Sequence, residues 1–412
     1  MKEYQNIFIM GTPSSSRINL LVLSSANHPQ ILGEIEELKK YYKVKYVKMS
    51  DYESFVRDKP EKKLWTLLKG IPAAILLAIK FRAMSPFSPA SLMLYLLFAP
   101  FILNLYKKTG RVDLIYAHWL YPAGLVGLIL KRLTNRKLVT VVWGYDIQTS
   151  VFEGLTNSLL RGLSKRIIEE SDLVITNHLI HRNIAVQLTK SNYNEKILFV
   201  PPGNQKLKVE KDRSTKMKIR FSIPSQNRII LYSPSLEDIY GIEEFIELVD
   251  KLSAKFPDVS FIIAGGCENK TRRDDIISKI NKTRYGDRVE IVGKVPFEDM
   301  PSLYDISTVV FDACYIGQGT TTIEAFSLGK PVIGFKTPKR LIDDGVNGYL
   351  IEKGDITTLE RHLSTLLVDS NLYNRFARNA LETFDRKFNV EKRVYALCDL
   401  FDNLLAGSPE IR

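Results

Sequence analysis

The sequence predicts an α/β protein of two domains, each built on a parallel sheet with helices on its faces. Short apolar runs alternate with amphipathic helical segments along most of the chain, which is the pattern of repeated βαβ units. The length of 412 residues is sufficient for two hydrophobic cores. The clearest βαβ unit spans residues 311–335 and also carries the strongest functional signal.

Residues 311–335 read FDACYIGQGTTTIEAFSLGKPVIGF. The predicted parts are, in order, a strand that closes at Phe311, a loop with Gly317 and Gly319, a short helix opened by Thr320, Thr321 and Thr322 and ended at Gly329, and a strand from Pro331 to Phe335. In a parallel sheet the loop after a strand faces the crevice where ligands bind. The glycines let a ligand approach the backbone, and the free N–H groups at the helix start suit a phosphate.

Glu324 has two interpretations. With Thr321 three residues earlier it matches a capping box, in which the glutamate side chain reaches back to the N–H group of the cap residue. Alternatively, its carboxylate accepts hydrogen bonds from two neighbouring hydroxyls of a ribose, as acidic residues do in dinucleotide-binding folds.

The N-terminal half shows the same alternation. Strands are predicted at 18–23, 44–49, 113–117, 137–142, 173–176 and 197–200, and helices near 30–42, 122–133 and 156–170. His118 follows the third of these strands, whereas Trp143 and Asp146 follow the fourth. The carboxyl ends of parallel strands meet at one edge of a sheet, so His118 and Asp146 are candidates for positioning a substrate hydroxyl. The alternative for His118 is a ring packed at the rim of the crevice.

Metal and disulfide chemistry is not expected. His178 and His181 would share a helix face, but no cluster of carboxylates or cysteines accompanies them. The cysteines Cys267, Cys314 and Cys398 lie far apart and match neither a metal motif nor a disulfide framework, so a reducing cytoplasm fits.

The C-terminal half follows a lysine-rich segment at 205–220, interpreted as a linker and then one helix. Further strands are predicted at 228–232, 259–264 and 288–292, and helices at 243–255 and 391–405. Val295 lies just after the third of these strands.

Two segments, DLIYAHWLYPAGLVGLILKRLTNRKLVTVVWGYDI and GQGTTTIEAFSLGKPVI, resemble the retaining glycosyltransferases of family 4. The resemblance covers about residues 110–365 and implies the GT-B fold, in which two Rossmann-like domains face a central cleft. It implies an acceptor-side domain at 1–204, a nucleotide-sugar-binding domain at 205–385, and a C-terminal helix, 386–412, that returns to the first domain.

The same resemblance implies a nucleotide-diphosphate sugar as substrate, with no cofactor and no metal. The implied donor-binding residues are Gly317, Gly319, Thr320, Thr321, Thr322, Glu324, Ser235 and Val295, the last of these beside the nucleobase. His118 and Asp146 would be catalytic, and Trp143 would contact the acceptor or the sugar. The expected reaction transfers a hexosyl-type sugar, with retention, to a hydroxyl of a lipid-linked or oligosaccharide acceptor.

Four positions depart from the family pattern. Trp143, Ser235, Tyr240 and Ile316 stand where relatives usually carry His, Arg, Lys and Glu. The Arg and Lys bind the donor diphosphate in relatives, so a second hypothesis is a catalytically degenerate homologue that acts as a binding or partner subunit. Basic residues of other loops are candidate replacements, namely Lys294, Lys336, Lys339 and Arg340.

The net charge of +12 predicts anionic partners, which include nucleotide phosphates and an acidic membrane surface. Nucleic acid is set aside because no recognised nucleic-acid-binding module is found. Residues 64–106 are strongly apolar with basic margins, and three interpretations apply: buried helices of the first domain, a membrane span, or helices lying on a membrane surface. The expected location is the cytoplasm, with peripheral attachment to the inner face of the cell membrane as a further hypothesis.

Overall fold

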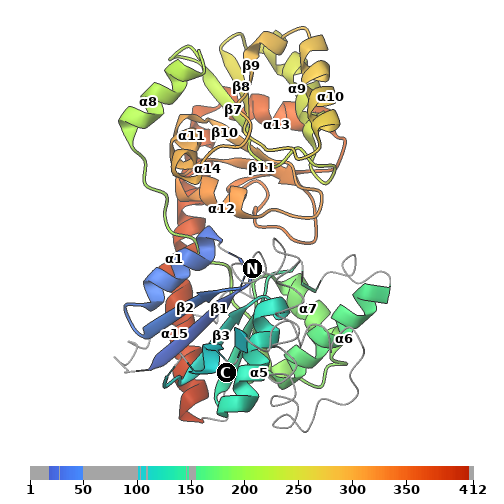
Figure 1. The fold of residues 1–412 in the computed structure, drawn as a ribbon. Coiled ribbons are helices and arrows are strands. Elements are labelled where there is room, and N and C mark those ends of the chain that lie inside the picture. The colour runs from blue at the N-terminus through green and yellow to red at the C-terminus, as the bar shows by residue number, and fades with distance from the viewer. Residues whose placement is uncertain are drawn as a thin grey trace. The chain divides into compact units, whose positions relative to one another are not determined.

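The structure, a computed structural model, describes residues 18–26, 28–49, 101–102, 104–107, 110–144, 146–147 and 155–407, with residues 155–160 described by their backbone alone. The chain divides into two compact units (Figure 1). Unit 1 comprises Met1–Gly203 and Val390–Arg412, and unit 2 comprises Asn204–Asn389.

Unit 1 contains a six-stranded sheet in the order β2-β1-β3-β4-β5-β6, in which every neighbouring pair is parallel. The strands are β1 (Asn19–Ser24), β2 (Lys43–Lys48), β3 (Leu114–His118), β4 (Lys137–Val142), β5 (Leu173–Thr176) and β6 (Ile197–Phe199). The central strands β3, β4 and β5 are mostly apolar because helices cover both of their faces. The edge strand β2 instead reads KVKYVK, and lysines on an edge discourage pairing with another chain.

Helices pack on both faces of this sheet. They are α1 (Pro29–Leu38), α5 (Leu125–Thr134), α6 (Leu155–Glu170), α7 (Leu179–Leu188) and α15 (Val390–Ala406), with a short π-helical turn at Leu120–Gly124 and a 3-10 turn at Asn194–Lys196. The side chains of β3 alternate between two cores: Ile115 packs with α5 on one face, and Tyr116 packs with α1 and α15 on the other. In Figure 1, α15 runs beside α1.

Unit 2 contains a second six-stranded parallel sheet, in the order β12-β11-β10-β7-β8-β9. Its strands are β7 (Arg228–Tyr232), β8 (Val259–Ile263), β9 (Val289–Ile291), β10 (Val309–Asp312), β11 (Val332–Phe335) and β12 (Gly348–Ile351). Its helices are α8 (Lys211–Arg220), α9 (Ile242–Lys255), α10 (Lys270–Lys282), α11 (Met300–Ile306), α12 (Thr320–Ser327), α13 (Ile356–Val368) and α14 (Ser370–Thr383). Short 3-10 turns occur at Gly286–Arg288 and Phe297–Asp299, and a π-helical turn at Phe384–Phe388.

Each sheet has a topological switch point, where consecutive connections depart in opposite directions. In unit 1 the switch lies between β1 and β3, and in unit 2 it lies between β7 and β10. Ligands of open α/β sheets bind at the carboxyl ends of the strands at such a point. In unit 2 the loops that meet there are 233–241 and 313–319, so the predicted βαβ unit β10-α12-β11 borders the switch.

The apolar segment 64–106 lies mostly outside the described residues. Its described end contributes Ile102 and Leu105 to the core of unit 1. None of the helices in the described part of the chain combines the length and apolar character that crossing a bilayer requires.

Two elements give little signal in the sequence. Helix α10 reads KTRRDDIISKINK and buries only Ile276 and Ile280, so its apolar periodicity is weak. Strand β12 has four residues and lies at the sheet edge.

A buried ion pair links the two chain segments of unit 1. Glu34 of α1 pairs with Arg393 of α15, and both side chains are only 3% exposed. Arg393 also donates hydrogen bonds to the carbonyls of Val200 and Pro201, at 2.9 and 2.7 Å. Burial alone would raise the pKa of Glu34, but Arg393 and His118 hold it at about 2, so the carboxylate stays ionised.

We expect Arg393→Met to destabilise unit 1 by about 3–5 kcal/mol at pH 7, because the substitution leaves Glu34 charged and unpaired. The double variant Glu34→Leu/Arg393→Met should recover part of that loss, because it removes both charges. Urea unfolding followed by tryptophan fluorescence measures this, since all three tryptophans of the chain belong to unit 1. A single variant as stable as the wild type would contradict the expectation.

Candidate functional site

The loop between β10 and α12 presents backbone groups at the switch point of unit 2. Gly317 has φ of +132°, and a Cβ atom there would lie 2.5 Å from both Cβ and the carbonyl oxygen of Lys339. Only glycine fits this combination of backbone angle and close approach. Gly319 is the N-cap residue of α12 and, as a glycine, has no side chain with which to cap the helix.

Asp312, the last residue of β10, caps α12 from outside the helix. Its Oδ2 atom accepts hydrogen bonds from the hydroxyl of Thr322 (2.6 Å) and the N–H group of Gly319 (3.3 Å). Thr320 and Thr321 begin the helix, and among the described residues their N–H groups have no acceptor. Two donors at the positive end of α12 therefore remain available for an anion.

Glu324 is the fifth residue of α12 and is 7% exposed. Its Oε2 accepts a hydrogen bond from the hydroxyl of Tyr304 (3.0 Å), which lies 3.3 Å from the hydroxyl of Ser233, just after β7. No described residue donates to Oε1. The capping-box interpretation is therefore wrong: Gly319 is the cap residue, and the carboxylate faces Tyr304 instead.

Burial raises the pKa of Glu324 to about 7, and the hydrogen bond from Tyr304 only partly opposes this shift. Burial also raises the pKa of Asp312, despite its hydrogen bonds from Thr322 and Gly319. Two buried carboxyls with raised pKa values beside one helix N-terminus identify this edge of the sheet as the candidate functional site.

The loop after β7 closes the same edge. Ser235 donates from Oγ to the carbonyl of Gly266 (3.0 Å), so its hydroxyl hydrogen is already engaged. The backbones of Tyr240 and Cys314 form an isolated antiparallel β-bridge. The N–H group of Gly241 donates a hydrogen bond to the carbonyl of Ala313 (2.8 Å). Val295 follows β9 and packs, half-buried, against the core of unit 2.

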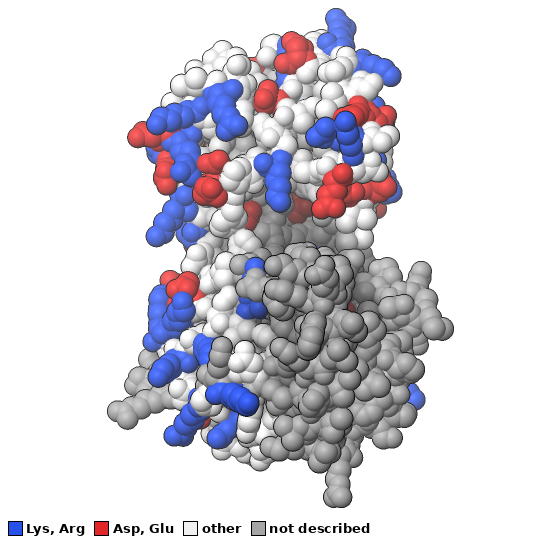
Figure 2. All heavy atoms as spheres, in the orientation of Figure 1, with Lys and Arg blue, Asp and Glu red and all other residues white. Residues whose placement is uncertain are grey.

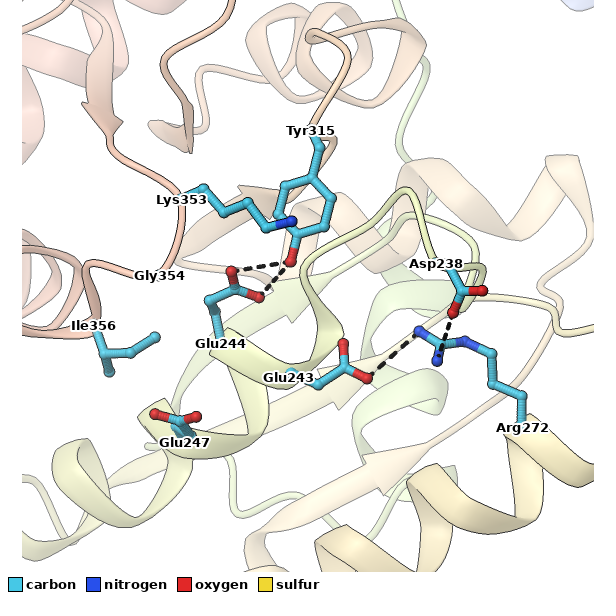
Figure 3. A pocket seen from close by; sticks show the side chains of 9 residues that line it. All are labelled: Asp238, Glu243, Glu244, Glu247, Arg272, Tyr315, Lys353, Gly354 and Ile356. Atoms are coloured by element: carbon cyan, nitrogen blue, oxygen red, sulfur yellow. Dashed lines mark hydrogen bonds and ion pairs between the residues drawn. The ribbon is translucent and has the colours of Figure 1, made fainter.

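A cavity of about 390 Å³ lies next to this loop but has the wrong charge for a diphosphate. Four carboxylates line it, from Asp238, Glu243, Glu244 and Glu247, against two cations, Lys353 and Arg272 (Figure 3). Arg272 is paired with Asp238 at 2.8 Å. The hydroxyl of Tyr315 donates to both oxygens of Glu244, at 2.9 and 2.8 Å.

The structure places His118 of unit 1 in the interior, with a side chain that is 0% exposed. Its Nδ1 accepts a hydrogen bond from the indole N–H of Trp143 (3.2 Å), and its Nε2 lies 3.3 Å from Oε1 of Glu34. This matches the packed alternative, with one ring nitrogen hydrogen-bonded and the other facing a carboxylate. Trp143 stacks on Trp119 with ring centroids 5.1 Å apart, and the ring of His28 lies 5.2 Å away.

Asp146 organises the loops after β3 and β4. Its carboxylate accepts hydrogen bonds from the N–H groups of Leu120 (2.9 Å), Trp143 (3.1 Å) and Gly144 (2.9 Å). Trp119, the first residue after β3, has φ of +71°, a backbone conformation that costs a non-glycine residue about 1–3 kcal/mol. Asp146 therefore holds the backbone at the carboxyl edge of this sheet.

Sequence reasoning missed Tyr304, Asp312 and Ser233, which complete the site in unit 2. A polar residue that ends an otherwise apolar strand, as Asp312 ends VVFD, is the signal that would have identified one of them. Among the described residues, no group of three or more His, Cys, Asp or Glu side chains is arranged to hold a metal ion.

The family comparison concerns the chain segment that contains this site. Residues 214–383 match the sequence profile of the family described as glycosyl transferases group 1. The matched stretch includes α12, Glu324 and the loops after β7, β8, β9 and β10.

Several curated proteins are similar over most of the chain. N-acetyl-alpha-D-glucosaminyl L-malate synthase of Bacillus anthracis is 22% identical over 317 residues, which cover 72% of this chain and 78% of the relative. The capsular polysaccharide biosynthesis glycosyltransferase CapM of Staphylococcus aureus is 24% identical over 276 residues, which cover 65% and 71% of the two chains.

Solved structures share the fold. HepE of Anabaena in complex with UDP-glucose has a TM-score of 0.67 at 19% identity and covers 94% of this chain and 100% of that chain. Sucrose-phosphate synthase from Thermosynechococcus elongatus has a TM-score of 0.67 at 17% identity and covers 95% and 100%. Two parallel six-stranded sheets with their helices are thus common to these proteins and this chain.

We expect Glu324→Gln to stabilise unit 2 by about 3 kcal/mol at pH 8 but by less than about 1 kcal/mol at pH 5. Between pH 4.5 and 7 the folded protein binds more protons than the unfolded chain, so the free energy of unfolding falls as pH rises, and above pH 7 the full cost is present. Glutamine removes the buried charge and keeps the acceptor for Tyr304.

Urea dependence of hydrogen exchange in the residues of unit 2 measures this stability. Glu382→Gln, at an exposed glutamate of α14, is the matched control and should show no such dependence on pH. An equal effect of Glu324→Gln at both pH values would refute the expectation.

Proposed function

The chain belongs to the group 1 glycosyltransferases, the family-4 type with the GT-B fold, and from this premise we propose the following reaction. Unit 2 binds a nucleotide-diphosphate sugar, and the enzyme transfers the hexosyl group, with retention of configuration, to a hydroxyl of an oligosaccharide or lipid-linked acceptor. No metal or cofactor takes part, because backbone dipoles and protein donors stabilise the leaving diphosphate.

One observation carries this proposal: near the start of α12, one carboxylate oxygen of Glu324 and two backbone N–H groups all lack a hydrogen-bond partner among the described residues. Among the described residues, no group donates a hydrogen bond to Oε1 of Glu324. The N–H groups of Thr320 and Thr321 likewise have no acceptor there. A ribose supplies neighbouring hydroxyl donors, and a diphosphate supplies acceptors with negative charge. A nucleoside diphosphate therefore complements both sets at once.

The remaining predicted donor residues fit subsidiary roles. The turn at Gly317 and Gly319 lets phosphate oxygens approach the backbone. Thr322 keeps Asp312 at the helix cap through its 2.6 Å hydrogen bond. Ser235 contacts the diphosphate only if its hydroxyl leaves Gly266, and Val295 borders the nucleobase. Several structures of similar fold contain UDP or UDP-glucose, which makes uridine the first base to test.

We assign the acceptor side to the carboxyl edge of the sheet in unit 1. Trp143, partly exposed and stacked on Trp119, offers an aromatic face to a sugar ring. His118 orients Trp143 through its 3.2 Å hydrogen bond, and Asp146 fixes the loop that carries Trp143. In this arrangement His118 and Asp146 position the aromatic ring of Trp143 and do not exchange protons with the acceptor.

We expect the protein to bind at least one of UDP, GDP and ADP in isothermal titration calorimetry. Glu324→Ala should weaken that binding by about tenfold or more, because the carboxylate no longer accepts hydrogen bonds from the ribose. Glu382→Ala is the matched control and should bind as the wild type does.

Circular dichroism and thermal unfolding establish that Glu324→Ala is folded. Failure of the wild type to bind any of the three nucleotides overturns the transferase proposal and favours the degenerate homologue, which the departures at Trp143, Ser235, Tyr240 and Ile316 first suggested.

The acceptor proposal includes a lipid-linked class because of the net charge of +12 and the apolar segment 64–106. We expect the protein to co-sediment with vesicles that contain acidic lipids, more at low salt than at high salt, and to leave zwitterionic vesicles unbound. Recovery of all the protein in the supernatant at low salt would remove the membrane-surface hypothesis and favour a free oligosaccharide.

A further inference from the structure

The proposed donor site contains too little positive charge to bind a diphosphate. A diphosphate keeps its negative charge when bound, yet the loop after β7, residues 233–241, contains no basic residue and two acidic ones, Glu237 and Asp238. Asp312 adds a buried carboxyl at the helix cap. Two free N–H groups and a helix dipole contribute modestly, so the site needs a cation from another part of the chain.

Four basic residues of nearby loops in unit 2 are candidates. Lys336 is paired with Glu352 at 3.1 Å. Lys294 and Arg340 are exposed to solvent, where a cation is strongly screened. Lys339 alone among the four is half-buried and has no hydrogen bond or ion pair to its side chain within the described part of the chain.

Two hydrogen bonds to its carbonyl fix the backbone of Lys339 beside the glycine loop. Its carbonyl accepts from the N–H group of Gln318 (3.1 Å) and from the hydroxyl of Thr337 (2.9 Å). The buried amide of Gln318 donates to the carbonyl of Phe335 (2.6 Å) and accepts from the N–H group of Leu341 (3.0 Å). The absence of a side chain at Gly317 makes room for Cβ and Cγ of Lys339.

The electrostatic surroundings of the Lys339 ammonium group suit an anionic ligand. Burial lowers the pKa of Lys339, and the charges of Cys314 and Asp312 oppose that shift only in part. No carboxylate of the described residues forms an ion pair with this ammonium group, and a phosphate would supply the counterion. Lysine binds phosphate as a point charge, without the fixed geometry that arginine needs.

We propose that Lys339 takes the place of the two missing family cations and binds the diphosphate of the sugar nucleotide at the glycine loop. This inference rests on the proposed function and identifies which residue of this chain makes it electrostatically feasible. The same ammonium group balances the leaving diphosphate when the bond to the sugar breaks.

The acidic cavity beside Tyr315 does not offer an alternative cation. Lys353 lies 3.9 Å above the ring of Tyr315, and that ring donates its hydroxyl to Glu244 (Figure 3). Around it, Glu243, Glu244 and Glu247 would repel a phosphate. The mixture of basic and acidic side chains on the face of unit 2 in Figure 2 likewise shows no single basic surface.

The test compares ligands as well as variants. Calorimetric titration of the full chain uses the tightest-binding of UDP, GDP and ADP together with the matching nucleoside, which lacks the phosphates. Lys339→Met should reduce the affinity for the diphosphate about tenfold or more and leave the affinity for the nucleoside within about twofold. Lys339→Arg, which keeps the charge, should retain most of the ratio between the two affinities.

Arg340→Met is the matched control, because Arg340 is the adjacent basic residue and is exposed. It should change the affinity for the diphosphate by less than about twofold. The ratio of diphosphate to nucleoside affinity, measured within one preparation, is insensitive to a smaller folded fraction and so separates binding from stability.

Two outcomes overturn the inference on Lys339: a ratio of diphosphate to nucleoside affinity that Lys339→Met leaves unchanged, or a loss of diphosphate affinity in Arg340→Met that equals the loss in Lys339→Met. A wild-type protein that binds none of the three nucleotides instead overturns the proposed function itself. The two failures are therefore distinguishable.

Discussion

The parallel pairing of β10 with β7 is the constraint on which the site in unit 2 depends. It brings Phe311 beside Tyr232 although their positions in the chain are far apart. The pairing makes the loops 233–241 and 313–319 neighbours, and the hydrogen bond from Gly241 to Ala313 joins them. A different strand order would leave α12 with a free N-terminus but without Ser233 and the rest of the carboxyl edge.

Around that pairing, the chain buries carboxyl groups where it is expected to bind an anion. Asp312 and Glu324 both have raised pKa values because burial disfavours their charged forms. The two carboxyls differ, since Asp312 accepts hydrogen bonds from donors at the start of α12, whereas Oε1 of Glu324 has no donor among the described residues. Such a site lowers the stability of the protein alone, and a bound ligand that satisfies the free groups would restore it.

Unit 1 uses its buried charges differently. Glu34 forms an ion pair with Arg393, accepts a hydrogen bond from Tyr116 (2.7 Å) and faces His118. This network attaches α15, which is distant in sequence, to the sheet and at the same time orients the ring that accepts from Trp143. Packing of the C-terminal helix and orientation of an aromatic surface at the sheet edge therefore share one set of contacts.

The sequence by itself determined the two α/β units, most strands and the βαβ unit around α12, because apolar periodicity and glycine positions are local signals. The role of Glu324 as a ligand of the ribose stays a prediction. Only the tertiary structure decided which strands pair, because pairing depends on contacts between distant residues. It therefore also decided that Asp312, rather than a capping box, closes α12, that Tyr304 and Ser233 adjoin Glu324, and that His118 is fully buried. Likewise, the choice of Lys339 among four candidate cations required burial and pairing, which no local pattern encodes.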